Sequence, residues 1–133
     1  MHKMVFPITV IKLGDPSVYV FSEKNFGLIS KGEQEFYSSG IIYDSTGKKF
    51  SINGANNVIP ASFLESLRYF QPMERVDVNV KFIQEVSLTE FKNNLIEHVK
   101  DYPDYWQQKD LLTNIIDTIN NANEFGPIIN YMK

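Results

Sequence analysis

The first half of the chain consists of short apolar runs separated by turn residues. Residues 5–13 and 17–22 are dominated by β-branched and aromatic side chains, and a Gly-Asp-Pro turn at 14–16 joins them. This pattern predicts a β-hairpin. Residues 26–30 and 34–37 flank a Lys-Gly pair and predict two further short strands joined by a tight loop.

A second hairpin is predicted around an Asp-Ser-Thr-Gly turn that begins at Asp44 and ends at Gly47. Residues 41–43 form an apolar run before it, and residues 48–52, which contain Phe50 and Ile52, follow it. The Asp44 carboxylate can accept a hydrogen bond from the backbone two residues on, and Gly47 can adopt the positive φ that closes such a turn. The polar residues 53–57 that follow are expected to form a loop.

Two elements with different periods come next. Phe63, Leu67 and Phe70 recur at helical spacing and predict a short helix over residues 61–70. Apolar and polar residues then alternate strictly over 76–82, which predicts an antiparallel strand with one apolar and one solvated face. The apolar positions of this strand are Val76, Val78, Val80 and Phe82.

The remainder of the chain has the period of helices. Ser87 and Glu90 form a capping-box pattern, in which the hydroxyl and the carboxylate satisfy backbone N–H groups at a helix start. An apolar stripe follows, so a helix is predicted from residue 87 to just before Pro103. A second stripe over 111–119 and a last apolar stretch over 127–132 predict two more helices.

These elements together predict an α+β fold, with an antiparallel sheet from the N-terminal half packed against C-terminal helices. Residues 1–86 are expected to be mainly strands with one short helix, and residues 87–133 mainly helices. Helices from about residue 61 and from residue 87 onward are expected to cover one face of the sheet. The sequence has no internal repeat or linker-like segment, so a single domain over residues 1–133 is expected.

The composition is that of a domain that folds around its own core. The chain is 43% hydrophobic and contains ten Phe and seven Tyr, so it needs no disulfide or metal to fold. Its lack of Cys removes thiolate chemistry. The apolar stretch 4–13 is interrupted by Pro7 and Lys12, and no run approaches the roughly 18 apolar residues of a membrane helix. A cytoplasmic protein that uses neither a membrane nor a cofactor is therefore expected.

Acidic residues are concentrated in the C-terminal part of the chain. Residues 1–84 hold nine Lys/Arg against eight Asp/Glu, whereas residues 85–124 hold eight Asp/Glu against three Lys. An acidic face repels nucleic-acid phosphates and attracts a basic partner. The alternative is that these carboxylates are a solvated helix surface that keeps the protein soluble.

Residues that carry catalysis or bind metals are sparse. His2 lies near the N-terminus, and His98 is predicted on a helix near its apolar stripe, so neither belongs to a set of convergent metal ligands. No Ser lies in a Gly-x-Ser-x-Gly elbow, and the glycines are scattered singly instead of forming a phosphate cradle. Glu33 and Glu35 share one face of a predicted strand, where they are expected to be ordinary solvated residues. We expect no enzyme activity and no metal site.

One stretch is distinctive, because residues 101–110 combine three acidic with three aromatic residues at a predicted break between helices. Tyr and Trp contribute strongly to protein interfaces, and carboxylates steer basic partners. The predicted partner-binding residues are Glu97, Asp101, Asp104, Tyr105, Trp106 and Asp110. The alternative is that Tyr102, Tyr105 and Trp106 fill the bottom of the core where two helices turn.

A family resemblance rests on the segment from Gly40 to Ile52. Its order of strand, aromatic-Asp-x-x-Gly turn (Tyr43, Asp44 and Gly47) and second strand, with helices further on, resembles small immunity proteins of bacterial polymorphic-toxin and contact-dependent growth inhibition systems. The resemblance implies a cytoplasmic protein that binds the toxic domain of a cognate effector, often a nuclease, and occludes its active site. Its carboxylates would then pair with basic residues of the toxin.

Two other functions stay open. The sheet and helices of a non-catalytic domain can enclose a pocket for a small ligand, which an open apolar cavity would favour. An enzyme of unfamiliar type would require convergent carboxylates around His98 in a cleft. The sequence does not decide the oligomeric state.

Overall fold

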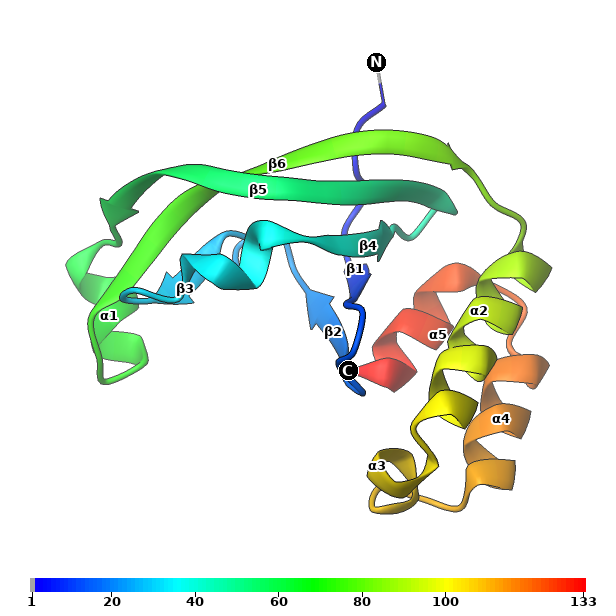
Figure 1. Cartoon of the computed structure of the whole chain (residues 1–133). Helices are drawn as coiled ribbons and strands as arrows, with labels where there is room; N and C mark the ends of the chain where they lie inside the picture. Colours follow the sequence, from blue (N-terminus) through cyan, green and yellow to red (C-terminus); the bar gives the residue numbers. More distant parts are fainter. Residues whose placement is uncertain (1) are drawn as a thin grey trace.

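The computed structural model of the chain describes residues 2–133 and confirms the α+β fold. Six antiparallel strands form one curled sheet in the order β2-β1-β4-β5-β6-β3, and the C-terminal helices pack at one end of it (Figure 1). The strands are β1 (Ile8–Ile11), β2 (Val18–Phe21), β3 (Leu28–Ser30), β4 (Gly40–Tyr43), β5 (Lys48–Pro60) and β6 (Met73–Glu85). The helices are the 3₁₀ helix η1 (Gln34–Ser38), α1 (Phe63–Arg68), α2 (Leu88–Asp101), α3 (Pro103–Gln107), α4 (Leu112–Asn121) and α5 (Phe125–Met132).

Both predicted hairpins are present, because β1 pairs with β2 and β4 pairs with β5, each antiparallel. Asp44 fixes the turn of the second hairpin. Its buried carboxylate accepts hydrogen bonds from the backbone N–H groups of Thr46 (2.8 Å) and Lys48 (2.9 Å). Gly47 has a φ of +90°, and a Cβ there would lie 2.7 Å from the carbonyl oxygen of Val86. This turn therefore requires glycine for its conformation and for the close approach.

The predicted strand at 34–37 is wrong, because these residues form η1. Adjacent side chains of a strand point to opposite faces. Here the rings of Phe36 and Tyr37 both lie near the ring of Phe21, with centroids 5.9 and 6.2 Å away. The 3₁₀ turn brings both rings to one side. The neighbouring strand prediction is confirmed as β3, although β3 pairs with β6.

The predicted loop at 53–57 is also wrong, because β5 continues through it to Pro60 and pairs with β6. The register shifts within this stretch, and Gly54 and Asn57 both have positive φ. Asn57 donates a side-chain hydrogen bond to Asp77 on β6 (2.8 Å). The polar side chains stay in solvent while the backbone pairs, so a strand forms where polarity alone predicted a loop.

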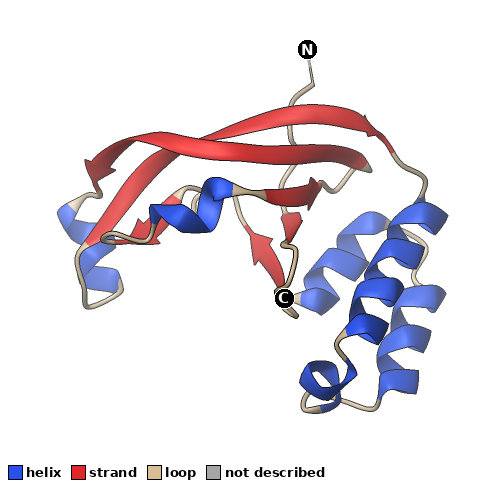
Figure 2. Ribbon diagram, in the orientation of Figure 1, coloured by secondary structure: helices blue, strands red, loops and turns tan. Residues whose placement is uncertain are grey.

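The predicted helix at 61–70 is confirmed as α1, but its place in the fold is not the expected one. All six of its residues are half-buried or exposed, including Phe63 and Leu67. The helix lies at the far end of the long β5–β6 hairpin from α2–α5 (Figure 2). The expectation that this helix covers the sheet is therefore wrong, whereas the C-terminal helices do pack against it.

The C-terminal helices follow the sequence pattern closely. The Ser87 hydroxyl accepts a hydrogen bond from the Glu90 N–H (3.1 Å) at the start of α2, and Pro103 opens α3. The predicted second and third helices correspond to α4 and α5. None of the helices described within residues 2–133 combines the length and the apolar character that crossing a membrane requires.

Strands β1, β2 and β4 contact an apolar core on each face. On one face, Val18 and Tyr43 join the core of the C-terminal helices. On the other face, Val10 and Ile42 join a core formed by the curled sheet and η1. These three strands thus connect two apolar cores, and the helices are fixed to the sheet through them.

Candidate functional site

The predicted acidic residues lie on the outer surface of the helical end. Glu97 and Asp101 are one helical turn apart on α2, so their carboxylates share a face of that helix. Asp104 lies in the first turn of α3, and Asp110 precedes α4. All four residues are exposed.

Two of these carboxylates border a groove between α2 and the sheet. A hollow of about 200 Å³ is lined by Glu97, His98 and Asp101 from α2, and by Ile11 and Ile41 from β1 and β4. A second hollow of about 260 Å³ shares four of these residues and extends to the β1–β2 turn. The acidic groove is defined here as Ile11, Leu13, Ile41, Glu97, His98 and Asp101.

The groove is held in place by packing and by hydrogen bonds from its own walls. Phe91 and Leu95 fix the inner face of α2 in the core. His98 Nε2 lies 3.1 Å from the carbonyl oxygen of Pro16, which ties α2 to the β1–β2 turn. Leu13 projects from that turn as a completely exposed apolar side chain. The groove therefore exists before any partner arrives.

Lys12, which lies beside the acidic groove, directs its ammonium group away from the carboxylates of Glu97 and Asp101. Lys12 lines the outer hollow, but its ammonium group donates hydrogen bonds to the carbonyl oxygens of Phe36 and Ser39. Burial lowers the pKa of Lys12, and the nearby Asp15 offsets part of that shift. Within residues 2–133, neither Glu97 nor Asp101 forms a salt bridge. The groove thus offers two carboxylates above an apolar floor.

This arrangement suits a lysine or arginine side chain from another molecule. The aliphatic part of such a side chain would cover Ile11 and Ile41, and its charged end would reach Glu97 and Asp101. Attraction between exposed charges also speeds the encounter of two proteins at low ionic strength.

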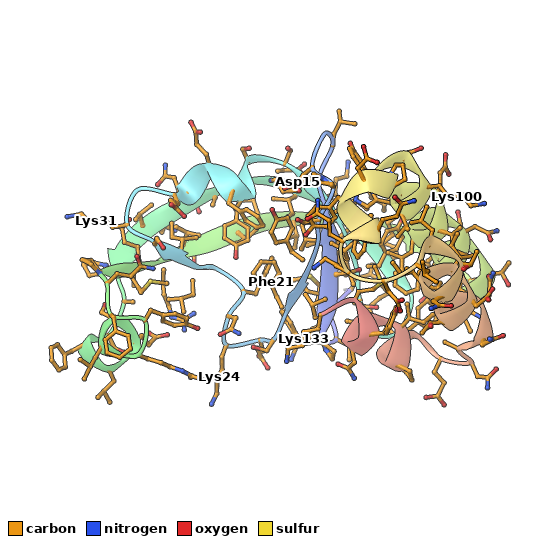
Figure 3. The ribbon with its side chains drawn as sticks, turned by 90° about the horizontal axis from the view of Figure 1, so that it is seen from below. Asp15, Phe21, Lys24, Lys31, Lys100 and Lys133 are labelled. Atoms are coloured by element: carbon orange, nitrogen blue, oxygen red, sulfur yellow. The ribbon has the colours of Figure 1, made fainter. Side chains whose placement is uncertain are left out.

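The aromatic residues of the predicted stretch belong mainly to the core. The Trp106 side chain is only 5% exposed and packs in the helical core, so little of its ring is available to a partner, and its role in partner binding stays a prediction. Tyr105 is half-buried, and its hydroxyl lies 3.0 Å from the Ser17 hydroxyl. The alternative in which these rings fill the space where two helices turn therefore describes Trp106 well. Figure 3 shows the β1–β2 turn, labelled at Asp15, next to α3.

Asp110 has a structural role at the start of α4. Its carboxylate accepts hydrogen bonds from the Leu111 N–H (2.7 Å) and from the Asn114 side chain (3.1 Å). It also lies at a different hollow from Glu97 and Asp101. The predicted set of six residues is thus divided: Glu97 and Asp101 line the acidic groove, Trp106 and Asp110 line a hollow between α3, α4 and α5, and Asp104 and Tyr105 line neither.

The hollow between α3, α4 and α5 is separate from the acidic groove. The tryptophan hollow has a volume of about 340 Å³ and is lined by Trp106, Lys109, Asp110, Ile115, Tyr131, Met132 and Lys133. The Trp106 Nε1–H is buried, and no residue among 2–133 accepts a hydrogen bond from it. The Lys109 ammonium lies 5.9 Å from the centre of the Trp106 ring.

Asp44, a titratable residue outside the groove, stabilises the fold. Burial by itself would raise the pKa of Asp44, but hydrogen bonds from Lys48, Val5 and Thr46 outweigh it and hold that pKa below its usual value. Asp44 is thus an anchor of the β4–β5 turn. Across the described part of the chain, no three His, Asp or Glu residues are grouped so that they could hold a metal ion.

Sequence reasoning missed the apolar floor of the groove. Ile11 and Ile41 were read only as strand residues, because nothing in the sequence tells which face of β1 and β4 meets a helix. Leu13 could have been recognised as part of a surface, since it is a large apolar residue directly before a Gly-Asp-Pro turn, where side chains are usually solvated.

Comparisons of the chain with known protein families, with characterised proteins and with solved structures found no match.

Proposed function

We propose that this chain acts by binding another protein, and that it is an immunity-type inhibitor that neutralises a bacterial toxin domain by covering its active site. The acidic groove is the observation that carries the proposal. It combines the carboxylates of Glu97 and Asp101 with an apolar floor, on elements that are fixed by the core. A basic side chain of the toxin is the ligand that this groove fits best.

The chemistry of nucleases makes them a suitable target class. Enzymes that act on nucleic acids place lysine and arginine around the phosphates of their substrates. A protein whose carboxylates are spaced like the substrate phosphates can bind those lysine and arginine residues in place of the substrate. The exposed Asp104 lies next along the chain and would extend the negative field around the groove.

Growth protection tests the proposal. The test co-expresses the chain in a bacterial host with a candidate toxin, defined as the toxic C-terminal domain of a secreted protein whose gene adjoins that of the chain. We expect the wild-type chain to restore growth and to form a complex with that domain. The double variant Glu97→Lys and Asp101→Lys should associate at least about tenfold more slowly at low salt, because the steering charges are reversed.

A matched variant separates the groove from the overall charge. Asp117→Lys with Glu124→Lys makes the same change in net charge at exposed positions outside the groove. This variant should associate nearly as fast as the wild type. Failure of the wild-type chain to protect contradicts the function, and equal losses in the two variants contradict the groove as the binding site.

A second candidate function is the binding of a small anionic ligand in the tryptophan hollow. Its volume of about 340 Å³ lies within the range of roughly 300–1,000 Å³ found for ligand pockets. The Trp106 Nε1–H would donate to the ligand, with Lys109 and Lys133 nearby. Because Trp106 is the chain's one tryptophan, its fluorescence should change saturably on titration with benzoate. An unchanged spectrum contradicts this function.

A further inference from the structure

Helix α1 carries an apolar surface that the rest of the chain leaves uncovered. Phe63, Leu64 and Leu67 are 79%, 75% and 54% exposed, and Phe70, just beyond the helix, is 92% exposed. Their spacing places them on one side of the helix. Together with Ile59 at the end of β5, which is 57% exposed, these residues are called the apolar tip. The apolar tip lies at the opposite end of the molecule from α2–α5 (Figure 1).

The apolar tip has a defined shape. Ser62 and Glu65 form a reciprocal capping box at the start of α1. The Glu65 carboxylate also forms an ion pair with Arg75 of β6, which fastens the helix to the hairpin. In addition, Met73 on β6 donates its N–H to the Ser66 hydroxyl (3.2 Å). The exposed apolar side chains are therefore held by a structured helix.

The backbone at Phe70 supports a role outside the single chain. The N–H of Phe70 bonds to the Leu67 carbonyl (3.1 Å), and the N–H of Gln71 bonds to the Ser66 carbonyl (3.3 Å). This is the Schellman pattern, in which glycine is the preferred residue at the position that Phe70 occupies. Phe70 has a φ of +55°, which is strained for an aromatic residue. In this strained conformation the Phe70 ring points into solvent, where the ring contributes little to the stability of the single chain.

The area of the apolar tip corresponds to that of one side of a protein interface. From the exposed fractions, its five residues present roughly 600–700 Å² of surface. The largest apolar patch on a monomer is typically about 300–600 Å², and a standard interface buries about 800 Å² per partner. Two copies of the apolar tip, with the residues around them, would reach the size of a stable dimer interface.

The charges around the apolar tip are balanced. Residues 65–75, which begin within α1, and residues 22–34, which hydrogen-bond to that segment, together hold four basic and four acidic residues. Figure 3 places Lys24 and Lys31 at the end of the molecule that carries α1, and Lys100 at the helical end. An anionic membrane or a strongly charged partner would require one sign of charge here. A neutral surface with both signs is suited to a second copy of itself.

We propose that the apolar tip is a self-association surface, through which two copies of the chain form a symmetric dimer. The α1 helices would pack against each other across a two-fold axis, so that each Phe70 enters the apolar surface of the partner copy. The acidic helical ends would then point away from each other, which minimises repulsion between them. Both acidic grooves stay accessible, so the dimer does not depend on the proposed function.

Helix packing explains the surface better than strand addition does. Within residues 2–133, β4 pairs with β5 only as far as Ile52, so the outer half of β5 has β6 as its one strand neighbour. An open strand edge can pair with another chain. Here, however, register shifts and the positive φ of Asn57 interrupt the edge, and Pro60 lacks an N–H. These features oppose a continuous ladder and leave α1 as the contact.

Sedimentation velocity tests the proposal with the full chain. The wild type is measured from about 2 to 500 µM, because interfaces of this size have dissociation constants from micromolar downward. We expect it to sediment as a dimer in the upper part of this range. Phe70→Gly should remain monomeric or dissociate at least about tenfold more easily, since it removes a central aromatic residue. Glycine suits the Schellman position, so its melting temperature at the lowest concentration should not fall below that of the wild type.

A pair of leucine variants provides the control. Leu64→Ser removes an exposed leucine from the apolar tip, whereas Leu111→Ser removes a leucine of similar exposure (66%) from the helical end. Only Leu64→Ser should weaken the dimer. A wild type that stays monomeric at about 500 µM, the highest concentration measured, overturns the proposal. A dimer that Leu111→Ser weakens as much as Leu64→Ser does also overturns it. Binding of monomeric protein to vesicles of phosphatidylcholine and phosphatidylserine also overturns it, because the apolar tip would then face lipid.

Discussion

At the scale of single residues, Asp44 carries the most concentrated set of polar contacts in the fold. Its carboxylate is fully buried and accepts hydrogen bonds from the Val5 N–H (3.0 Å), from the N–H and hydroxyl of Thr46 (2.8 Å each) and from the Lys48 N–H (2.9 Å). Asp44→Asn removes the charge and turns one of the two acceptor oxygens into an NH2 donor, which then faces either the Val5 N–H or the N–H groups of Thr46 and Lys48. We expect the free energy of unfolding at pH 7 to fall by about 2–4 kcal/mol, as measured by urea unfolding.

The same contacts predict how stability depends on pH. Burial raises the pKa of Asp44, but the hydrogen bonds from Lys48, Val5 and Thr46 outweigh it, so the pKa is lower in the folded than in the unfolded chain. The stabilisation is complete above about pH 4, the ordinary pKa of Asp, and is lost as the pH falls through the folded-state pKa. Asp44→Asn should flatten this acid-side decline, whereas the exposed Asp117→Asn should leave it unchanged. An equal decline in both variants contradicts the assignment.

The residue scale also shows how far local sequence can be read. The turn from Asp44 to Gly47 was predicted, because each residue type has a local reason to be there. The contact between Asp44 and the Val5 backbone was not, since it joins segments 39 residues apart. Trp106 was ambiguous for the same reason, because an aromatic residue beside acids fits an interface as well as a core. Long-range packing decides both cases.

At the scale of elements, the start of α4 lacks a side-chain cap. Leu111 occupies the capping position with an extended backbone and is 66% exposed. A serine there can accept a hydrogen bond from the first turn, which leucine cannot. Leu111→Ser should therefore raise the free energy of unfolding by about 0.5–1.5 kcal/mol, as measured by urea unfolding. A lower stability would show that Leu111 contributes more to packing than its exposure indicates.

The elements that sequence predicted well are those with a strong local signal. The capped helix α2 and the two turn-linked hairpins fall in this class. The outer half of β5 was missed, because its asparagines suit a loop locally and are held in a strand only by pairing with β6. The helix α1 was found, but its apolar face was assigned to the core. Periodicity shows that a helix has an apolar face, and it does not show what that face meets.

At the scale of the whole molecule, the three strands between the two cores explain the sequence of β1, β2 and β4. These strands are apolar along most of their length, as expected of strands that contact a core on each face. β6 alternates instead, because only one of its faces is apolar. The apolar and alternating patterns of these strands thus agree with their places in the fold. The acidic groove was not, since it arises where two predicted elements meet at an angle that neither determines.

The shared strands predict that the two cores unfold together. Ile42 lies in the sheet core and Ile129 in the helical core, and both are fully buried. Ile42→Ala and Ile129→Ala should each lower the free energy of unfolding by about 2–5 kcal/mol. Trp106 reports on the helical core by fluorescence, and circular dichroism reports on all elements. Because Val18 and Tyr43 tie the helices to the sheet, Ile42→Ala should shift both signals to the same lower urea midpoint. A fluorescence midpoint that stays at the wild-type value would mean that the helical end is stable without the sheet, and that the proposed groove between them is not rigid.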